Sequence, residues 1–179
     1  MKITPYITQE RIAQVVSTLA SQIEYYYRER ERELVIIVVY NGAMFFASDL
    51  LKQVNLHCEI VGVQASSYYG NTSSSGSVAC KNNIDVNNKH VLIIDDIYDT
   101  GLTLNEICKD LLDKGAITVE MCVLLNKQIK KTVDLDVLFV GINIPNIFVY
   151  GYGLDVNNRF RNLNYIAVYE SESTNSISS

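Results

Sequence analysis

The first third of the chain alternates between a helical and a strand-like pattern of apolar residues. Over residues 8–30 the apolar positions recur at helical spacing, which predicts an amphipathic helix. Residues 34–39 are apolar at every position, as in a strand that is buried on both faces of a parallel sheet. The same patterns predict helices over 43–54 and 103–115, and strands over 58–64, 91–94, 117–125 and 137–141.

This alternation of strands and helices indicates the fold class. Successive strand–helix–strand units favour right-handed crossovers, and therefore an α/β fold with a central, mostly parallel sheet flanked by helices. A length of 179 residues suits one domain, 1–179, with a single core. The polar tail, about 170–179, is expected to be frayed.

Composition narrows the class of protein and its partners. Hydrophobic residues make up 48% and charged residues 20% of the chain, and the formal net charge is −5. With no basic block, a nucleic-acid partner is not expected. The chain has neither a signal-like apolar core near its start nor an apolar run long enough to span a membrane, so we expect a cytoplasmic protein without a membrane partner.

Two further features give weaker indications. The four cysteines form no C-x-x-C pair, which favours free thiols over a zinc site. Residues 66–76 are rich in serine and glycine and cannot bury a core. This segment is either a mobile lid over a site or a plain flexible linker, and composition favours neither.

The most distinctive chemistry lies between residues 95 and 103. Asp95 and Asp96 directly follow the apolar strand 91–94, and ligands of parallel sheets bind beyond the carboxyl ends of strands. Two adjacent carboxylates need hydrogen-bond donors, and sugar hydroxyls are suitable ones. The run that follows combines a glycine and hydroxyl side chains at a helix start, which is typical of a phosphate site: Asp99, Thr100, Gly101, Leu102 and Thr103.

A purely structural interpretation of this segment exists. The pattern D-x-x-D-T-G-x-T could be a strand-to-helix turn, and Thr103 and Glu106 have the spacing of a capping box. Six polar or glycine positions within nine residues make that interpretation the weaker one. The segment is neither a P-loop, because no Gly-Lys-Ser/Thr follows, nor a dinucleotide-binding G-x-G-x-x-G motif.

The run from Val91 to Leu104 resembles the phosphoribosyl pyrophosphate motif of the type I phosphoribosyltransferases. Three further segments are similar to the hypoxanthine-guanine members of that family. They are the pyrophosphate loop and following helix at 40–50, the start of the flexible catalytic loop at 66–68, and the purine-binding segment at 148–155 with 159–163. The resemblance covers about residues 34–168 and implies a small hood formed from the N- and C-terminal segments.

The family's activity is what the resemblance implies for this chain. These enzymes of purine salvage transfer the 5-phosphoribosyl group from phosphoribosyl pyrophosphate to N9 of hypoxanthine or guanine. The products are IMP or GMP and pyrophosphate. The resemblance also implies Mg²⁺ as cofactor and a homodimer or homotetramer.

The resemblance assigns roles to individual residues. Asp95 and Asp96 hold the ribose hydroxyls, residues 99–103 wrap the 5′-phosphate, and Asp99 assists proton transfer at N7 of the base as the catalytic residue. The remaining contacts are to pyrophosphate (Asn41, Gly42, Ser67, Tyr68 and Arg161), to the purine (Lys127, Phe148 and Val149) and to the metal (Asp155 and Asp95). A cation at Lys127 would select 6-oxopurines over adenine, whose 6-amino group cannot accept its hydrogen bond.

Each assignment has a simpler alternative. Asp99 could only form the turn, Lys127 could be a solvated lysine in the run with Lys130 and Lys131, Phe148 a core aromatic residue, and Arg161 the partner of Asp155 in a surface ion pair. Other functions in this fold are a preference for xanthine or adenine, regulation through RNA binding, and binding of phosphoribosyl pyrophosphate without turnover.

The sequence also departs from the family pattern. Tyr40-Asn41-Gly42-Ala43 lacks the side-chain cation that relatives often carry at this step, so pyrophosphate contact there relies on backbone N–H groups. Relatives often have a non-proline cis peptide here, which the sequence alone does not decide.

Overall fold

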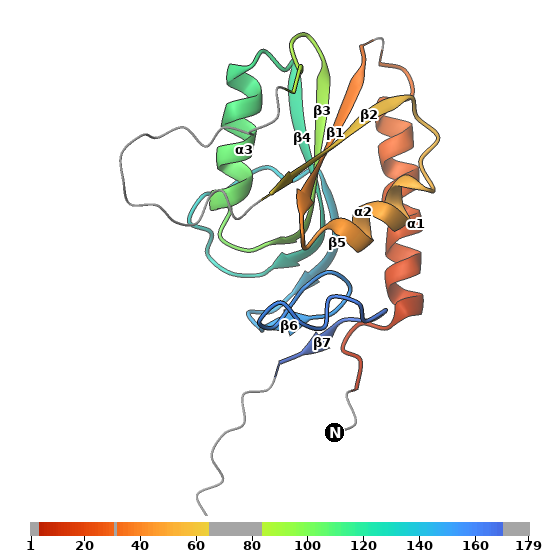
Figure 1. Ribbon diagram of the computed structural model, residues 1–179, viewed down its shortest axis with the longest axis vertical. Coiled ribbons are helices and arrows are strands. Elements are labelled where there is room, and N and C mark those ends of the chain that lie inside the picture. Colours follow the sequence, from red (N-terminus) through yellow and green to blue (C-terminus); the bar gives the residue numbers. More distant parts are fainter. Residues whose placement is uncertain (1–3, 31, 65–83, 170–179) are drawn as a thin grey trace, which may run out of the picture.

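The computed structural model describes residues 4–30, 32–64 and 84–169. Five strands form a wholly parallel sheet in the order β2-β1-β3-β4-β5, which confirms the predicted α/β class (Figure 1). Their bounds are β1 Leu34–Tyr40, β2 Cys58–Gln64, β3 His90–Tyr98, β4 Thr118–Lys127 and β5 Phe139–Ile144. The strand order reverses between β1 and β3, and such a switch point is where open parallel sheets bind ligands.

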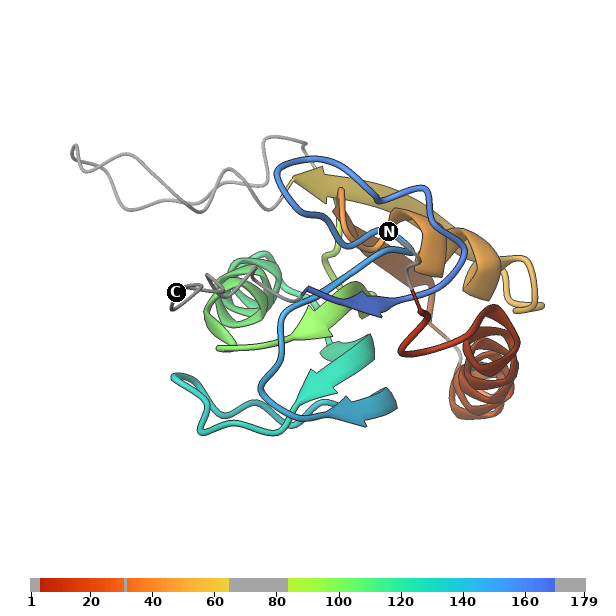
Figure 2. The same cartoon turned by 90° about the horizontal axis from the view of Figure 1, so that it is seen from below.

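Helices cover both faces of the sheet. Figure 2 shows α1 (Gln9–Tyr27) and α2 (Met44–Leu51) on one side and α3 (Leu102–Asp113) on the other. Alternate residues of each strand therefore enter two separate apolar clusters, one beneath α1 and α2 and one beneath α3. The central strands are apolar on both faces for this reason.

Helix α1 is shorter than the predicted 8–30. Thr8 is the N-cap and accepts a hydrogen bond from Arg11 N–H at 3.3 Å, and the helix ends at Tyr27. Tyr26 and Tyr27 pack inward, the former edge-on against Phe139, so of the three consecutive tyrosines only Tyr25 is largely exposed, at 69%.

Strand β3 extends well past the predicted 91–94. Its pairing with β1 ends at Val38–Ile94, whereas its pairing with β4 continues as far as Tyr98. Asp95 and Asp96 therefore do not follow the strand, as the sequence suggested, but lie inside it, where β3 has lost one neighbour. The two acids therefore lie beside the point where β1 and β3 stop pairing, and not beyond the end of β3.

The start of α3 also differs from the sequence prediction. Its N-cap is Gly101, with no side-chain cap, and Thr103 is already the second helical residue, so the capping box of Thr103 and Glu106 is wrong. Gly101 has φ +87°, and a Cβ at this position would overlap the carbonyl oxygen of Val133. Only glycine combines that backbone conformation with that approach.

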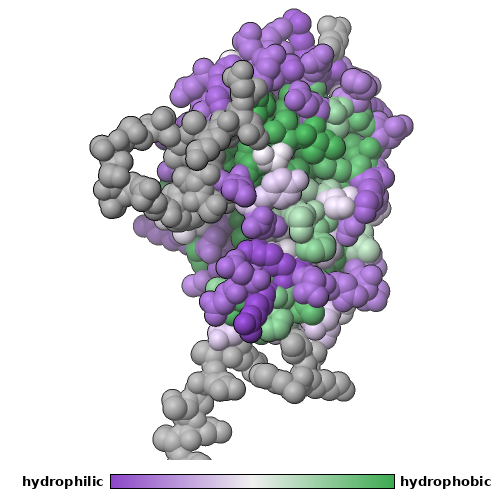
Figure 3. Space-filling view, viewed as in Figure 1, coloured by the Kyte–Doolittle hydropathy of each residue, from purple (hydrophilic) through white to green (hydrophobic). Residues whose placement is uncertain are grey.

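The expected hood is present beyond the sheet. Strands β6 (Val149–Tyr150) and β7 (Ala167–Val168) pair antiparallel, and Ile7 bridges to Ile166, which joins the N-terminal and C-terminal segments (Figure 1). On the face shown in Figure 3, strongly hydrophilic residues gather over the hood, and apolar residues show over β2 and α2. No helix within the described residues is long and apolar enough to cross a membrane. The predicted lid and tail lie outside those residues.

Candidate active site

A cavity of about 380 Å³ lies at the switch point between β1 and β3. The carboxyl end of β1 forms one wall, and the end of β3 with the start of α3 forms another. Nine of the predicted site residues line it: Asn41, Gly42, Asp95, Asp96, Asp99, Thr100, Gly101, Thr103 and Arg161. Residues that are far apart in the sequence thus line one polar cavity.

Asp95 and Asp96 are the most strongly perturbed acids at the cavity. Asp95 is buried, and its Oδ1 accepts a hydrogen bond from Asp96 N–H at 2.9 Å. Burial, followed by the neighbouring Asp96 charge, raises the pKa of Asp95 well above its ordinary value. Burial also raises the pKa of Asp96. Hydrogen bonds with Asp95 and with backbone N–H groups, and the positive charge of Arg161, partly offset this rise. Such a pair is stabilised by a ligand that donates hydrogen bonds.

Two glycines allow the walls of the cavity to meet. A Cβ on Gly42 would overlap the carboxylate of Asp96, and a Cβ on Gly153 would overlap the carbonyl oxygen of Gly42. The loop after β1 therefore lies directly against the Asp96 side chain of β3 and against the backbone of the hood. The peptide bond between Tyr40 and Asn41 in this loop is cis.

The turn from β3 into α3 presents the N-terminus of a helix to the cavity. Thr100 Oγ1 lies 3.5 Å from Leu102 N, and the carbonyl of Thr100 accepts from both Thr132 and Val133 N–H groups at 3.0 Å. The segment after β4 thus holds the turn in place. A helix N-terminus attracts anions through its N–H groups and dipole, as predicted for the phosphate site.

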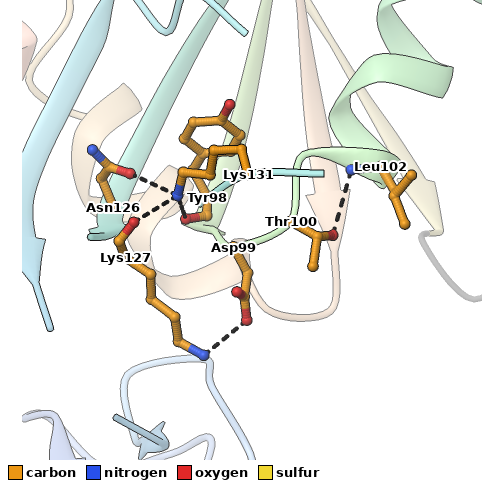
Figure 4. A network of polar contacts seen from close by, with 7 residues as sticks. All are labelled: Tyr98, Asp99, Thr100, Leu102, Asn126, Lys127 and Lys131. Carbon is orange, nitrogen blue, oxygen red and sulfur yellow. Dashed lines mark hydrogen bonds and ion pairs between the residues drawn. The ribbon is translucent and has the colours of Figure 1, made fainter. Parts of the chain in front are cut away.

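Asp99 and Lys127 are paired with each other at the edge of the cavity (Figure 4). Lys127 Nζ lies 2.8 Å from Asp99 Oδ2, joining the turn after β3 to the last residue of β4. The lysine side chain is only 13% exposed, so it is not a solvated lysine. Lys127 also lines a second cavity of about 510 Å³ under the loop between β4 and β5.

The predicted purine-contacting aromatic residue is not a core residue. Phe148 precedes β6 and is 54% exposed, with its ring centroid 5.7 Å from that of Tyr169. Val149 is buried within β6, opposite Val168. Neither residue lines the main cavity, so Phe148 offers a free aromatic face at the hood.

Asp155 and Arg161 form an ion pair, which was the simpler alternative to a pyrophosphate contact for Arg161. Arg161 Nη2 lies 2.7 Å from Asp155 Oδ1, and its Nη1 donates to the carbonyl of Gly153 at 2.6 Å. The second Asp155 oxygen accepts from Asn158 N–H at 2.7 Å. Arg161 nevertheless lines the cavity, while Asp155 stands behind it.

Some site residues were missed from the sequence, and others cannot be placed. Tyr40, Gln64 and Asn158 line the cavity without having been predicted, the first two as register partners at the ends of β1 and β2. Gln64 is indicated only by this pairing, which the sequence does not display, whereas Tyr40 borders the predicted pyrophosphate loop. Ser67 and Tyr68 lie outside the described residues.

Comparison with known proteins supplies the family. Residues 5–157 match the model of the phosphoribosyl transferase domain. A hypoxanthine-guanine phosphoribosyltransferase of Staphylococcus aureus is 36% identical over 168 residues, covering 93% of this chain and 93% of the relative. Two solved structures are also similar. One is a hypoxanthine-guanine phosphoribosyltransferase from Bacillus anthracis, with a TM-score of 0.83, 32% identity and coverage of 94% and 100%.

The other is a hypoxanthine phosphoribosyltransferase from Trypanosoma cruzi in complex with the product IMP. Its TM-score is 0.79 at 28% identity, and the match covers 92% of this chain and 88% of that one. The parallel sheet with flanking helices is thus the fold of a phosphoribosyltransferase. The chain belongs to the hypoxanthine-guanine phosphoribosyltransferase family.

Proposed function

We propose that the cavity transfers the 5-phosphoribosyl group of phosphoribosyl pyrophosphate to N9 of hypoxanthine or guanine, giving IMP or GMP and pyrophosphate. The observation that carries this proposal is that three kinds of group meet at one cavity. These are the adjacent acids Asp95 and Asp96, the turn at Thr100 before α3, and Asp99 with its partner Lys127. They suit, respectively, the hydroxyls of a ribose, a 5′-phosphate and a 6-oxopurine.

The ribose phosphate is held by complementary charge and hydrogen bonding. The carboxylates of Asp95 and Asp96 accept hydrogen bonds from the ribose hydroxyls, which add donors to the Asp96 N–H that already reaches Asp95. The start of α3, at Gly101 to Thr103, binds the 5′-phosphate through backbone N–H groups. Asn41, Gly42 and Arg161 line the cavity and receive the pyrophosphate. The sequence resemblance assigns Ser67 and Tyr68, which lie outside the described residues, to the same group.

When the base binds, the contact between Asp99 and Lys127 is replaced by one hydrogen bond from each residue to the base. Lys127 donates to O6 of the purine, and the freed carboxylate of Asp99 accepts a hydrogen bond from N7–H. Phe148 stacks on the ring, and the backbone of Val149 contacts the base edge. Adenine carries an amino group at position 6, which cannot accept from Lys127, so binding of adenine leaves a buried cation unpaired.

Magnesium fits the acids that surround the cavity. Each oxygen of Asp155 accepts one hydrogen bond in the structure and keeps a lone pair, and Asp95 adds a second carboxylate at the cavity. The described residues contain no cluster of three candidate ligands, which suits an ion that binds through one or two carboxylates and substrate oxygens. Bound Mg²⁺ neutralises the negative charge of the departing pyrophosphate.

In the chemical step the C1′–oxygen bond to pyrophosphate breaks as N9 forms a bond to C1′. Positive charge builds on the ribose, and Arg161 stabilises the negative charge on the leaving group. Asp99 accepts the N7 proton that the base must lose. The protein holds the base and C1′ in line, and exclusion of water protects the reactive carbon.

Product analysis tests this reaction. The protein is incubated with phosphoribosyl pyrophosphate, Mg²⁺ and hypoxanthine, and IMP and pyrophosphate are measured; we expect equal amounts of both, and none without Mg²⁺. Release of pyrophosphate without IMP, or no release, contradicts the proposal. In the latter case a mobility shift with RNA at physiological salt tests the regulatory alternative.

Two proposals concern the protein in the cell. We place it in the cytoplasm, where its substrates are made, and test this with a fluorescent fusion. We also propose a homodimer or homotetramer, since Ile60 on the edge strand β2 and Met44 on α2 are 54% and 43% exposed. Light scattering of the purified protein measures this, and a monomer at working concentration contradicts it.

A further inference from the structure

Lys131 is tied down more completely than its position in a lysine-rich loop suggests. Its Nζ lies 2.9 Å from the carbonyl oxygen of Tyr98, 2.6 Å from that of Lys127 and 3.1 Å from Asn126 Oδ1 (Figure 4). The same ammonium group lies 4.0 Å from the centroid of the Tyr98 ring. An ammonium group has three N–H donors, and all three are used here. Burial lowers the pKa of Lys131, and the nearby carboxylates of Asp99 and Asp134 oppose that effect.

The three acceptors lie at the ends of two neighbouring strands. Tyr98 is the last residue of β3 and precedes Asp99, whereas Asn126 and Lys127 end β4. Lys131 therefore links the backbone beside Asp99 to the backbone of Lys127, although it touches neither of their charged groups. Asp99 and Lys127 each follow the last paired residues of β3 and β4, Tyr98 and Asn126, so the ladder between these two strands does not include them.

The chain that follows Lys131 braces the same region. Val133 N–H donates to the Thr100 carbonyl at 3.0 Å, and its own carbonyl accepts from the Tyr98 hydroxyl at 3.0 Å. Leu135 N–H donates to that hydroxyl at 2.8 Å. Segment 131–135 is thus a strap across the turn after β3, and the Lys131 ammonium is its cationic anchor. Lys130, its neighbour, is exposed.

We propose that Lys131 is a positioning residue for the purine, which sets the spacing of Asp99 and Lys127 by joining the ends of β3 and β4. This inference rests on the proposed roles of Asp99 and Lys127. Because the acids of the ribose site lie earlier on β3 and pair with β4 through the ladder, the effect of Lys131 falls on the base and not on phosphoribosyl pyrophosphate.

The test compares Lys131→Met with Lys130→Met, which makes the same chemical change on an exposed neighbour. Steady-state kinetics give kcat and KM for hypoxanthine and for phosphoribosyl pyrophosphate separately, and thermal unfolding checks the fold. We expect Lys131→Met to raise KM for hypoxanthine about tenfold, the usual effect of losing a charged hydrogen-bond partner, with KM for phosphoribosyl pyrophosphate changed less than about twofold. Lys131→Arg, which keeps the charge and donors, restores part of the loss.

A double-variant cycle separates positioning from general stability. If Lys131 acts through Lys127, adding Lys131→Met to Lys127→Ala produces no further rise in KM for hypoxanthine. A full additive effect, equal rises in both KM values, or a Lys131→Met protein that behaves as Lys130→Met overturns the proposal. If Lys131→Met does not fold, Lys131→Gln replaces it under the same criteria.

The same experiment distinguishes this inference from the underlying function. Wild-type turnover of hypoxanthine, and a higher KM for hypoxanthine in Lys127→Ala, decide the proposed function without reference to Lys131. If those two results hold and only the Lys131 comparison fails, the positioning role is wrong and the proposed function stands.

Discussion

Lys127 Nζ and Asp99 Oδ2 are 2.8 Å apart, so the residue proposed to read the base and the residue proposed to take its proton neutralise each other. The pair bridges the end of β4 and the turn after β3. Both charges are therefore satisfied without substrate, and a base must offer an acceptor and a donor together to replace them. A 6-oxopurine with hydrogen on N7 does so.

Replacing Asp99 by asparagine should remove the proton acceptor while keeping the size of the side chain. General-base assistance contributes about 10²- to 10⁴-fold, so we expect kcat to fall by at least about 10²-fold. Steady-state rates at saturating substrates measure this. Asp134→Asn, at an exposed acid in the following loop, is the control. A fall of less than threefold would show that Asp99 only shapes the turn.

Replacing Asp96 by asparagine should stabilise the protein and abolish binding of phosphoribosyl pyrophosphate. The pKa of both acids is raised by burial, so the folded state binds protons more tightly than the unfolded chain. Stability from this pair is therefore present below the ordinary aspartate pKa, about 3.9, and is lost as pH rises through the raised values. At neutral pH we expect Tm to increase by about 2–4 °C.

The control for this prediction is Asp113→Asn, at the exposed end of α3. Thermal unfolding of both variants from pH 4 to pH 8 should show a flatter pH dependence only for Asp96→Asn. A lower Tm for Asp96→Asn at neutral pH contradicts the assignment of a strained acid pair.

Gly42→Ala should destabilise the protein because the new Cβ would overlap the carboxylate of Asp96. We expect a loss of stability that depends on that carboxylate. Combining it with Asp96→Ala should then recover about 1 kcal/mol relative to the sum of the single changes. Denaturant unfolding of the four proteins measures the coupling, and additivity would mean that the two residues do not meet.

Truncating Phe148 should affect the base and not the fold. The side chain is 54% exposed, so Phe148→Ala should leave Tm nearly unchanged, whereas stacking on a base is worth about 1–3 kcal/mol, or at least about fivefold in KM for hypoxanthine. Tyr25→Ala, at an aromatic residue on α1 that is 69% exposed, is the control. Equal KM values for the two variants would remove Phe148 from the purine site.

The core strands and the turn before α3 were predictable because they depend on local sequence. The apolar run 34–39 indicates a buried strand, and the segment Asp95 to Thr103 indicates a polar turn, in each case without reference to the rest of the chain. The full span of β3 was not predictable in this way, since its extension to Tyr98 requires β4 as a partner and the loss of β1.

Contacts between distant segments account for the other differences. The cap at Gly101 depends on the approach of Val133. Lys131 is half-buried rather than a solvated lysine because it donates to the Tyr98 carbonyl and to Asn126 Oδ1. Periodicity along the chain carries no information about such pairs. The sequence interpretation missed residues whose neighbours in space come from distant parts of the chain.

The selectivity of wild type and Lys127→Ala between hypoxanthine and adenine tests the central claim most directly. The quantity to measure is the ratio of kcat/KM for the two bases with saturating phosphoribosyl pyrophosphate and Mg²⁺. A wild-type preference for hypoxanthine of about 10³-fold or more, reduced at least about tenfold in Lys127→Ala, is the predicted result. Comparable use of adenine by the wild type, or an unchanged ratio in the variant, would contradict the assignment of Lys127 as the group that recognises a 6-oxopurine.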